Sequence, residues 1–216
     1  MRSITKGREP GELTQYRRQK DACYDGPLFT EVKDAVRRQL LREQGHLCAY
    51  CMQRISAVTM KVEHWHCRSK YPCEGLDYGN MLAVCHGNEG SPSTQQNCDT
   101  AKGDKELKYN PADSTHDVER LVNYYGDGRI GSNDPVLREQ LDDVLNLNQS
   151  RLRRDREQVV DAVRLMLGRD RGSRSAAEIR RLRDGWSAPD KEGKLKEYCG
   201  VAVYLLNKRL NRRARR

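Results

Sequence analysis

Cysteine and histidine are concentrated in one short stretch of the chain, and this concentration constrains the fold more than any other feature. Residues 45–110 contain six of the eight cysteines and four of the five histidines, among polar loops rich in glycine. Two apolar runs there, Lys61–His66 and Met81–Cys85, are long enough for strands. A segment with so little apolar bulk needs a further constraint, and a bound metal ion is one that its cysteines can supply.

The composition predicts a folded protein with a strongly solvated surface, since 36% of its 216 residues are hydrophobic and 33% are charged. The sequence has no run of about 18 apolar residues, the length of a membrane helix, and Met1–Pro10 is too charged for a signal peptide. We therefore expect a cytoplasmic protein without a membrane partner. Thiols stay reduced in the cytoplasm, so its cysteines are expected to bind metal rather than form disulfides.

Apolar side chains recur at helical spacing on both sides of the cysteine-rich stretch. Residues 31–44 predict one helix, with Thr30 as its N-terminal cap and Gly45 at its end. Three further stripes predict helices in the last third of the chain; they are Leu137, Leu141, Val144 and Leu145; Leu152, Val159, Val160, Val163 and Met166; and Val201, Leu205 and Leu206. Residues 168–175 read as a connection between the second and third stripes, and residues 212–216 as a basic tail.

These patterns predict an α+β fold that is mainly helical and has three segments. Residues 1–44 form an N-terminal helical arm, residues 45–110 a zinc-stabilised core, and residues 111–216 a C-terminal helical region. The net charge of +9 is confined to the end of the chain, because residues 149–216 contain 20 Lys and Arg against 9 Asp and Glu. Such a block favours nucleic acid or an acidic partner. The alternative interpretation is an ordinary solvated helical surface.

The cysteine spacing predicts a closed zinc site. Cys48 and Cys51 are separated by two residues, a turn that directs both sulfurs at one tetrahedral ion. Cys85 and Cys98 are the candidates for the other two ligands, one at the end of an apolar run and one at the start of a predicted helix. The gap between them must loop out, and His86 is the alternative to Cys98 as the fourth ligand.

The residues between and beside these cysteines have the chemistry of a hydrolase. Glu63 and His64 lie on the first predicted strand, Asn80 precedes the second, and Asp99 follows Cys98 at a predicted helix N-terminus. An imidazole with two carboxylates and an amide is an inventory suited to hydrolysing a phosphodiester with one hard cation.

Cys48-x-x-Cys51, Glu63-His64, Asn80, Cys85 and Cys98-Asp99-x-x-Lys102-Gly103 resemble the ββα-metal motif of HNH endonucleases. Three further stretches, residues 43–52, 76–80 and 145–148, resemble the PtuB family. Its members are HNH nucleases of Septu and retron anti-phage systems that act with an ATPase, PtuA. The resemblance implies a nuclease that cuts nucleic acid, with a PtuA-type ATPase as partner and, in the retron setting, a reverse transcriptase with its msDNA.

The resemblance also implies residue roles. His64 would be the general base, Glu63 and Asp99 would ligate Mg²⁺ or Mn²⁺, and Asn80 would tie the loop between the strands and orient His64. Lys102, Arg68 and Lys70 are candidates for phosphate contacts, each with a merely solvated side chain as the alternative. Two rival functions remain open at this stage: a zinc-ribbon nucleic-acid-binding module without catalysis, and a scaffold subunit whose surface is the helical stripes.

Overall fold

The computed structural model of the chain describes residues 1–168 and 174–214. The connection predicted at residues 168–175 lies mostly outside these ranges, as do the last two residues of the predicted tail. The fold class is α+β, as predicted, and the described residues contain two small antiparallel sheets. The elements are α1 (Gly11–Tyr16), α2 (Phe29–Glu43), β1 (Met60–His64), β2 (Met81–Cys85), α3 (Cys98–Lys102), α4 (Val118–Leu121), β3 (Val122–Tyr124), β4 (Ile130–Ser132), α5 (Pro135–Glu139), the π-helix η4 (Gln140–Val144), α6 (Ser150–Gly168), α7 (Ala176–Ser187) and α8 (Cys199–Ala214), with short 3₁₀ turns at Pro72–Glu74, Tyr78–Asn80 and Ser93–Gln95.

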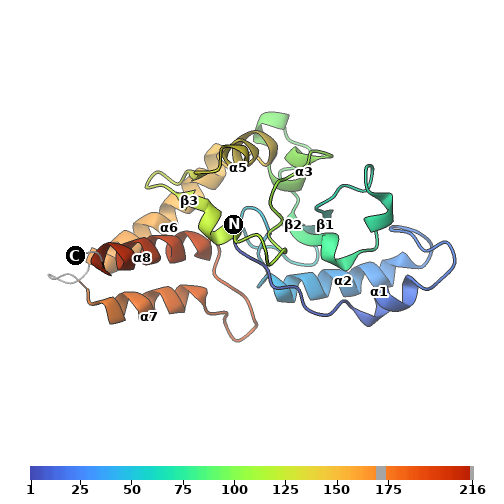
Figure 1. Ribbon diagram of the computed structural model, residues 1–216, viewed down its shortest axis with the longest axis horizontal. Coiled ribbons are helices and arrows are strands. Elements are labelled where there is room, and N and C mark those ends of the chain that lie inside the picture. The colour runs from blue at the N-terminus through green and yellow to red at the C-terminus, as the bar shows by residue number, and fades with distance from the viewer. Residues whose placement is uncertain (169–173, 215–216) are drawn as a thin grey trace.

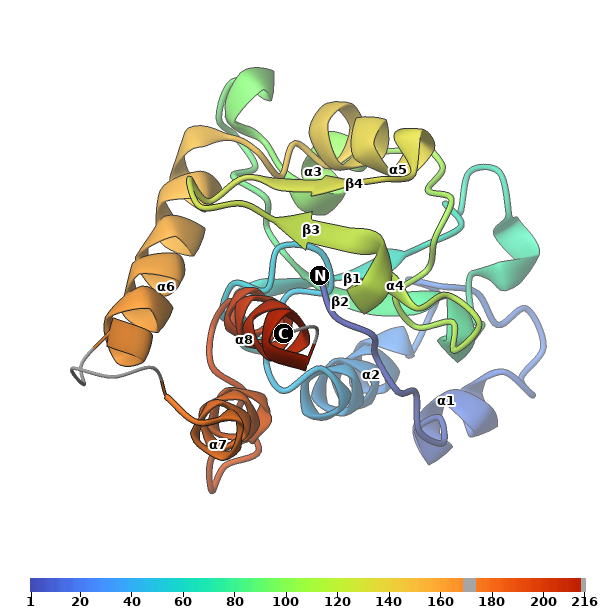
Figure 2. The same cartoon turned by 60° about the vertical axis from the view of Figure 1, so that its left-hand side comes forward.

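The elements divide between two ends of the molecule (Figure 1). Helices α1 and α2 and the β1–β2 pair lie at one end, and α6, α7 and α8 at the other. The β3–β4 hairpin lies between them with α5 above it, as the turned view in Figure 2 makes clear. One apolar cluster nevertheless includes residues from all three predicted segments, among them Leu40, Val84 and Leu141. A smaller cluster of Val163, Ile179, Ala202 and Leu206 joins α6, α7 and α8.

Helix α2 forms because its apolar residues recur every four positions and are buried together, with Val36 and Leu40 fully inaccessible. The helix begins at Phe29, before the predicted start, and the residue that precedes it is Leu28 in the left-handed region at φ 62°. Thr30 therefore lies inside the first turn, and the prediction that it caps the helix is wrong.

The β1–β2 pair is antiparallel, with Glu63 opposite Leu82 and His64 opposite Met81. A sheet of two strands is marginal by itself, and the outer edge of β2 is completed by the buried side chain of Gln44. Its amide donates to the Ala83 carbonyl at 2.7 Å, and its carbonyl accepts from the Ala83 N–H at 2.8 Å. The edge of β2 is thus satisfied by the end of α2, which fixes the sheet against that helix.

The second sheet was missed from sequence. Strands β3 and β4 have three residues each, too few for a readable alternation of apolar and polar side chains. The available signal is Asp127-Gly128 between them, a dipeptide typical of hairpin turns.

The three predicted stripes do form helices, on α5 with η4, on α6 and on α8. Among the described residues, no helix combines the length and the apolar character that a bilayer crossing requires.

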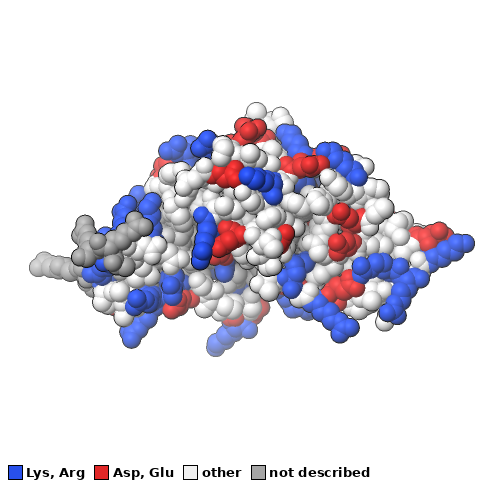
Figure 3. Space-filling model, viewed as in Figure 1, with Lys and Arg blue, Asp and Glu red and all other residues white. Residues whose placement is uncertain are grey.

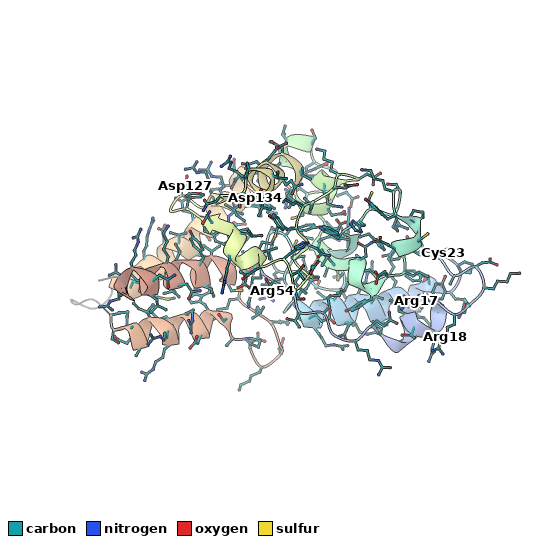
Figure 4. All side chains as sticks on the ribbon, viewed as in Figure 1. Arg17, Arg18, Cys23, Arg54, Asp127 and Asp134 are labelled. Carbon is teal, nitrogen blue, oxygen red and sulfur yellow. The ribbon has the colours of Figure 1, made fainter. Side chains whose placement is uncertain are left out.

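Arg54 joins the cysteine-rich segment to the loop before α8, and Figure 4 places it near the middle of the molecule. Its guanidinium donates to the carbonyls of Gly45 at 3.1 Å, of His46 at 3.3 Å and of Leu195. Its backbone N–H donates to Glu197 Oε1 at 2.7 Å. The C-terminal helices are therefore attached to the same turn that precedes Cys48.

Arg156 on α6 also connects separate segments by hydrogen bonds, and it is 1% exposed. Nε donates to the Gly128 carbonyl at 2.7 Å, and Nη2 donates to the Leu147 carbonyl at 2.7 Å and to Asn148 Oδ1 at 3.3 Å. The side chain therefore ties α6 to the hairpin turn and to the loop after η4.

We expect Arg156→Met to lower the free energy of unfolding by about 3 kcal/mol, because it leaves buried carbonyls without a donor. The measurement is urea unfolding followed by circular dichroism. Arg154→Met is the matched control, since Arg154 is exposed and lies two residues away on the same helix, and it should change the free energy by less than about 0.5 kcal/mol. Equal losses in both variants would contradict this role for Arg156.

Candidate functional site

Four cysteines converge in the structure as the spacing predicted. The Sγ atoms of Cys48, Cys51, Cys85 and Cys98 all lie within 4.8 Å of one another, and all four residues are buried. The Cys48–Cys98 and Cys51–Cys85 sulfur pairs are each 3.8 Å apart. Four sulfurs at the usual Zn–S distance of about 2.3 Å from a shared ion stand about 3.8 Å apart. The cluster can therefore hold a structural metal ion such as zinc.

Cys98, not His86, completes the cluster. Cys98 begins α3 in the left-handed region at φ 54°, which turns its side chain toward the other three cysteines. The His86 side chain is half exposed, and its Nδ1 lies 3.9 Å from Glu89. His86 as fourth ligand is therefore wrong, because the chain turns outward immediately after β2.

The residues between Cys85 and Cys98 form a closed loop, which explains the wide gap. The Asn97 N–H donates to the Gly87 carbonyl at 2.9 Å and closes the base of the loop. A Cβ on Gly87 would lie 2.1 Å from the Asn97 carbonyl oxygen, and its φ is +59°. Only glycine fits there. Asn146 holds the other end of this loop, because its Nδ2 donates hydrogen bonds to the carbonyls of Thr94 at 3.0 Å and Gln96 at 2.7 Å.

A cleft of about 630 Å³ adjoins the cluster, between α2, β1, α3 and the loop after β1. Five of the seven predicted catalytic and substrate-contacting residues line it: Glu63, His64, Arg68, Asp99 and Lys102. Asn80 and Lys70 are not among its lining residues. The tertiary structure thus brings both predicted acids and the predicted base into one cavity.

Glu63 lies at the base of the cleft and is 4% exposed. Its Oε1 accepts a hydrogen bond from the Tyr50 hydroxyl at 3.1 Å. The same oxygen forms an ion pair with Lys102 Nζ at 2.8 Å. Burial raises the pKa of Glu63 well above its usual range, and a hydrogen bond with Asp99 raises it further. Two carboxyl groups within hydrogen-bonding reach are an oxygen donor set that fits a hard divalent cation.

His64 is 6% exposed and is held by two contacts. Nε2 lies 2.9 Å from the Gly75 carbonyl, and the ring packs edge-on against Tyr24 with centroids 4.5 Å apart. Burial lowers the pKa of His64, so the ring is neutral at pH 7. Because a carbonyl can only accept, Nε2 carries the proton and Nδ1 carries the free lone pair.

Asn80 acts on the backbone beyond His64, not on its ring. Its Oδ1 accepts from the His66 N–H at 2.7 Å, and its Nδ2 donates to the His66 carbonyl at 3.0 Å. These bonds end β1 at His64, two residues before the predicted end. The His66 ring is turned elsewhere, with Nδ1 2.7 Å from Glu74 and its face stacked on Tyr71.

The three predicted phosphate contacts have different surroundings. Arg68 is exposed at the cleft rim, 3.6 Å from Asp25 and over the Tyr24 ring. Lys70 lies outside the cleft and pairs with Glu106 at 3.4 Å. Lys102 is 1% exposed, and its ammonium is committed to Glu63. Lys70 thus lies outside the cleft, whereas Lys102 lines it but is paired with Glu63, and the phosphate contacts of all three residues stay predictions.

Sequence reasoning missed four residues of the cleft wall. Tyr24, Lys33 and Arg37 come from the arm and α2, and Lys61 lies on β1 with its Nζ 3.0 Å from Glu89 and 3.9 Å from Asp99. Lys33 and Arg37 are four residues apart, next to the buried stripe of α2, and this spacing was a signal that one cleft-facing side of the helix is basic.

A larger cavity, of about 730 Å³, lies elsewhere, between α4, β3 and α8. Neither histidine nor cysteine occurs among the described residues that line it. It therefore lacks the imidazole and thiol groups that the cleft contains. The surface view in Figure 3 shows Lys and Arg interspersed with Asp and Glu over that face, without one continuous basic patch.

No protein-family model matches the chain, and no curated protein matches it.

We expect the purified chain to contain one zinc ion that Cys98→Ser largely removes. Loss of the ion should lower the free energy of unfolding by on the order of 5 kcal/mol, because metal binding and folding are coupled. Zinc is measured with a colorimetric chelator after denaturation, and unfolding by calorimetry. Cys73→Ser, at an exposed cysteine outside the cluster, is the control. Full zinc content in Cys98→Ser would exclude this ligand set.

We expect Lys102→Met to lower the free energy of unfolding by about 3 kcal/mol or more, because it leaves the buried carboxylate of Glu63 unpaired. Adding Glu63→Gln should restore part of the loss. The control is Lys70→Met, which breaks an exposed pair worth less than about 1 kcal/mol. Denaturant unfolding measures all of these variants. If the double variant is as unstable as the sum of the single ones, the two side chains are not coupled.

Proposed function

We propose that this protein is a metal-dependent endonuclease that hydrolyses phosphodiester bonds in nucleic acid. The observation that carries the proposal is the convergence of His64, Glu63 and Asp99 in one cleft beside the four-cysteine cluster. The order of the elements supports it, because β1 and β2 pair antiparallel and α3 follows and packs against β2. This is the strand–strand–helix order of the HNH motif that the sequence resembles, and we propose membership of the PtuB group on that resemblance.

His64 acts as the general base in this proposal. Nδ1 holds the lone pair that takes a proton from an attacking water, and the bond of Nε2 to Gly75 fixes the tautomer and the ring. The edge of Tyr24 restricts the ring from the other side. Asn80 is a positioning residue, since it holds the backbone of the turn that follows His64.

Glu63 and Asp99 would hold Mg²⁺ or Mn²⁺, and the cysteines a structural Zn²⁺. A divalent ion in such a site stabilises negative charge on the phosphate and on the departing oxygen. The cations of the cleft wall, Lys33, Arg37, Lys61 and Arg68, provide contacts for a phosphate backbone. These contacts read the backbone rather than the bases, so they favour nucleic acid without a sequence preference.

The setting we propose is anti-phage defence, with a PtuA-type ATPase controlling the nuclease. The basic excess of the C-terminal segment supports a second contact, with nucleic acid or with an acidic face of that ATPase. A zinc-dependent nucleic-acid-binding module without catalysis is the competing function, and the same charge and the same cysteines favour it. That module has no use for a neutral, buried histidine beside two acids.

The test is cleavage of plasmid DNA and of total RNA with Mg²⁺ or Mn²⁺ present or chelated, with and without the ATPase. We expect cleavage that requires the cation, and a loss of about 100-fold or more in His64→Ala, the contribution of a general base. His66→Ala is the matched control two residues away. Both variants should keep the zinc content of the wild type. Cleavage by His64→Ala at the wild-type rate, or no cleavage of either polymer by the wild type, would contradict the proposal.

A further inference from the structure

Tyr50 connects the cysteine cluster to the cleft. It lies between Cys48 and Cys51 in the turn that carries both, and it has no exposed surface. Two backbone hydrogen bonds fix the turn. The Cys48 N–H donates to the Gln53 carbonyl at 2.9 Å, and the Met52 N–H donates to the Cys48 carbonyl at 3.0 Å. From this turn the Tyr50 hydroxyl reaches Glu63 Oε1 at 3.1 Å. The position of that hydroxyl is therefore set by the cluster.

Glu63 is held on one oxygen by two donors. Tyr50 and Lys102 both donate to Oε1, and the carboxyl group of Asp99 lies within hydrogen-bonding reach of the same side chain. Two carboxyl groups placed this close together form an oxygen pair that can bind one cation. Asp99, the second acid, is adjacent to Cys98 in the chain, so the cluster also determines where the second carboxylate lies.

We propose that Tyr50 is a positioning residue through which the four-cysteine cluster fixes Glu63 for binding a divalent cation. The inference rests on the cation site of the proposed function. Tyr50 itself touches neither a cation nor a substrate in this arrangement. Groups that hydrogen-bond to metal ligands typically change metal affinity by 10- to 100-fold when removed. Phenylalanine keeps the ring that fills the core and removes only the hydroxyl, so the change isolates this one bond.

The chain offers a matched control in Tyr78, which is 4% exposed and whose hydroxyl donates to Glu43 Oε2 at 2.7 Å. This is a second hydrogen bond from tyrosine to glutamate, partly buried, and neither partner lines the cleft. Tyr78→Phe therefore reports what the loss of such a bond does to the protein in general.

The experiment titrates the full-length, zinc-saturated protein with Mn²⁺ and measures free Mn²⁺ by electron paramagnetic resonance. We expect Tyr50→Phe to raise the Kd for Mn²⁺ roughly 10-fold and Tyr78→Phe to leave it within about 2-fold, with the zinc content of both unchanged. In a Glu63→Ala background, Tyr50→Phe should have no further effect on the Kd, because the hydroxyl then has no carboxylate to orient.

Two results would overturn the inference. If Glu63→Ala weakens Mn²⁺ binding but Tyr50→Phe does not, the cation site stands and Tyr50 is not its positioning residue. The same holds if Tyr50→Phe weakens binding equally with and without Glu63, since its effect is then a general one on the fold. If Glu63→Ala leaves Mn²⁺ binding unchanged, the cation site itself is wrong, and the inference fails together with that part of the proposed function.

Discussion

The convergence of four cysteine sulfurs is the interaction on which the rest of this structure depends. It joins the turn after α2, the end of β2 and the start of α3, which are otherwise linked by loops. A sheet of two strands and a helix of five residues are each too short to be stable by themselves. When the cysteines hold these elements together at one point, they form a rigid frame. Both acids of the cleft belong to it, Glu63 on β1 and Asp99 on α3.

The buried pair of Lys102 and Glu63 indicates what the frame is for. Burying two charges is unfavourable unless the geometry is close and the remaining polar atoms are bonded. Here the ammonium is 2.8 Å from the carboxylate, and the Tyr50 hydroxyl bonds the same oxygen. An apolar pair would fill this space at lower cost in stability. The ionic pair instead holds an acid in a fixed orientation in the wall of the cleft, which is what the proposed cation site requires.

The proposed chemistry and the basic segment are separated in the fold. The cleft lies among α2, β1 and α3, whereas α6, α7 and α8 occupy the opposite end of the molecule (Figure 1). The contacts of Arg54 with the turn before Cys48 and with the loop before α8 tie the two ends together. The C-terminal helices and the turn that leads into the cluster are therefore directly connected.

The sequence by itself determined three of the cysteine ligands, the first two strands and the neighbouring acid and base on β1, because residue spacing and apolar runs are local properties of a chain. Only the tertiary structure decided between Cys98 and His86, paired Lys102 with Glu63, left Lys70 outside the cleft, and brought Lys33 and Arg37 to its wall. These outcomes depend on how far one element lies from another and on which atoms lose contact with water. Neither quantity is encoded in spacing along the chain; both arise when separate elements pack together.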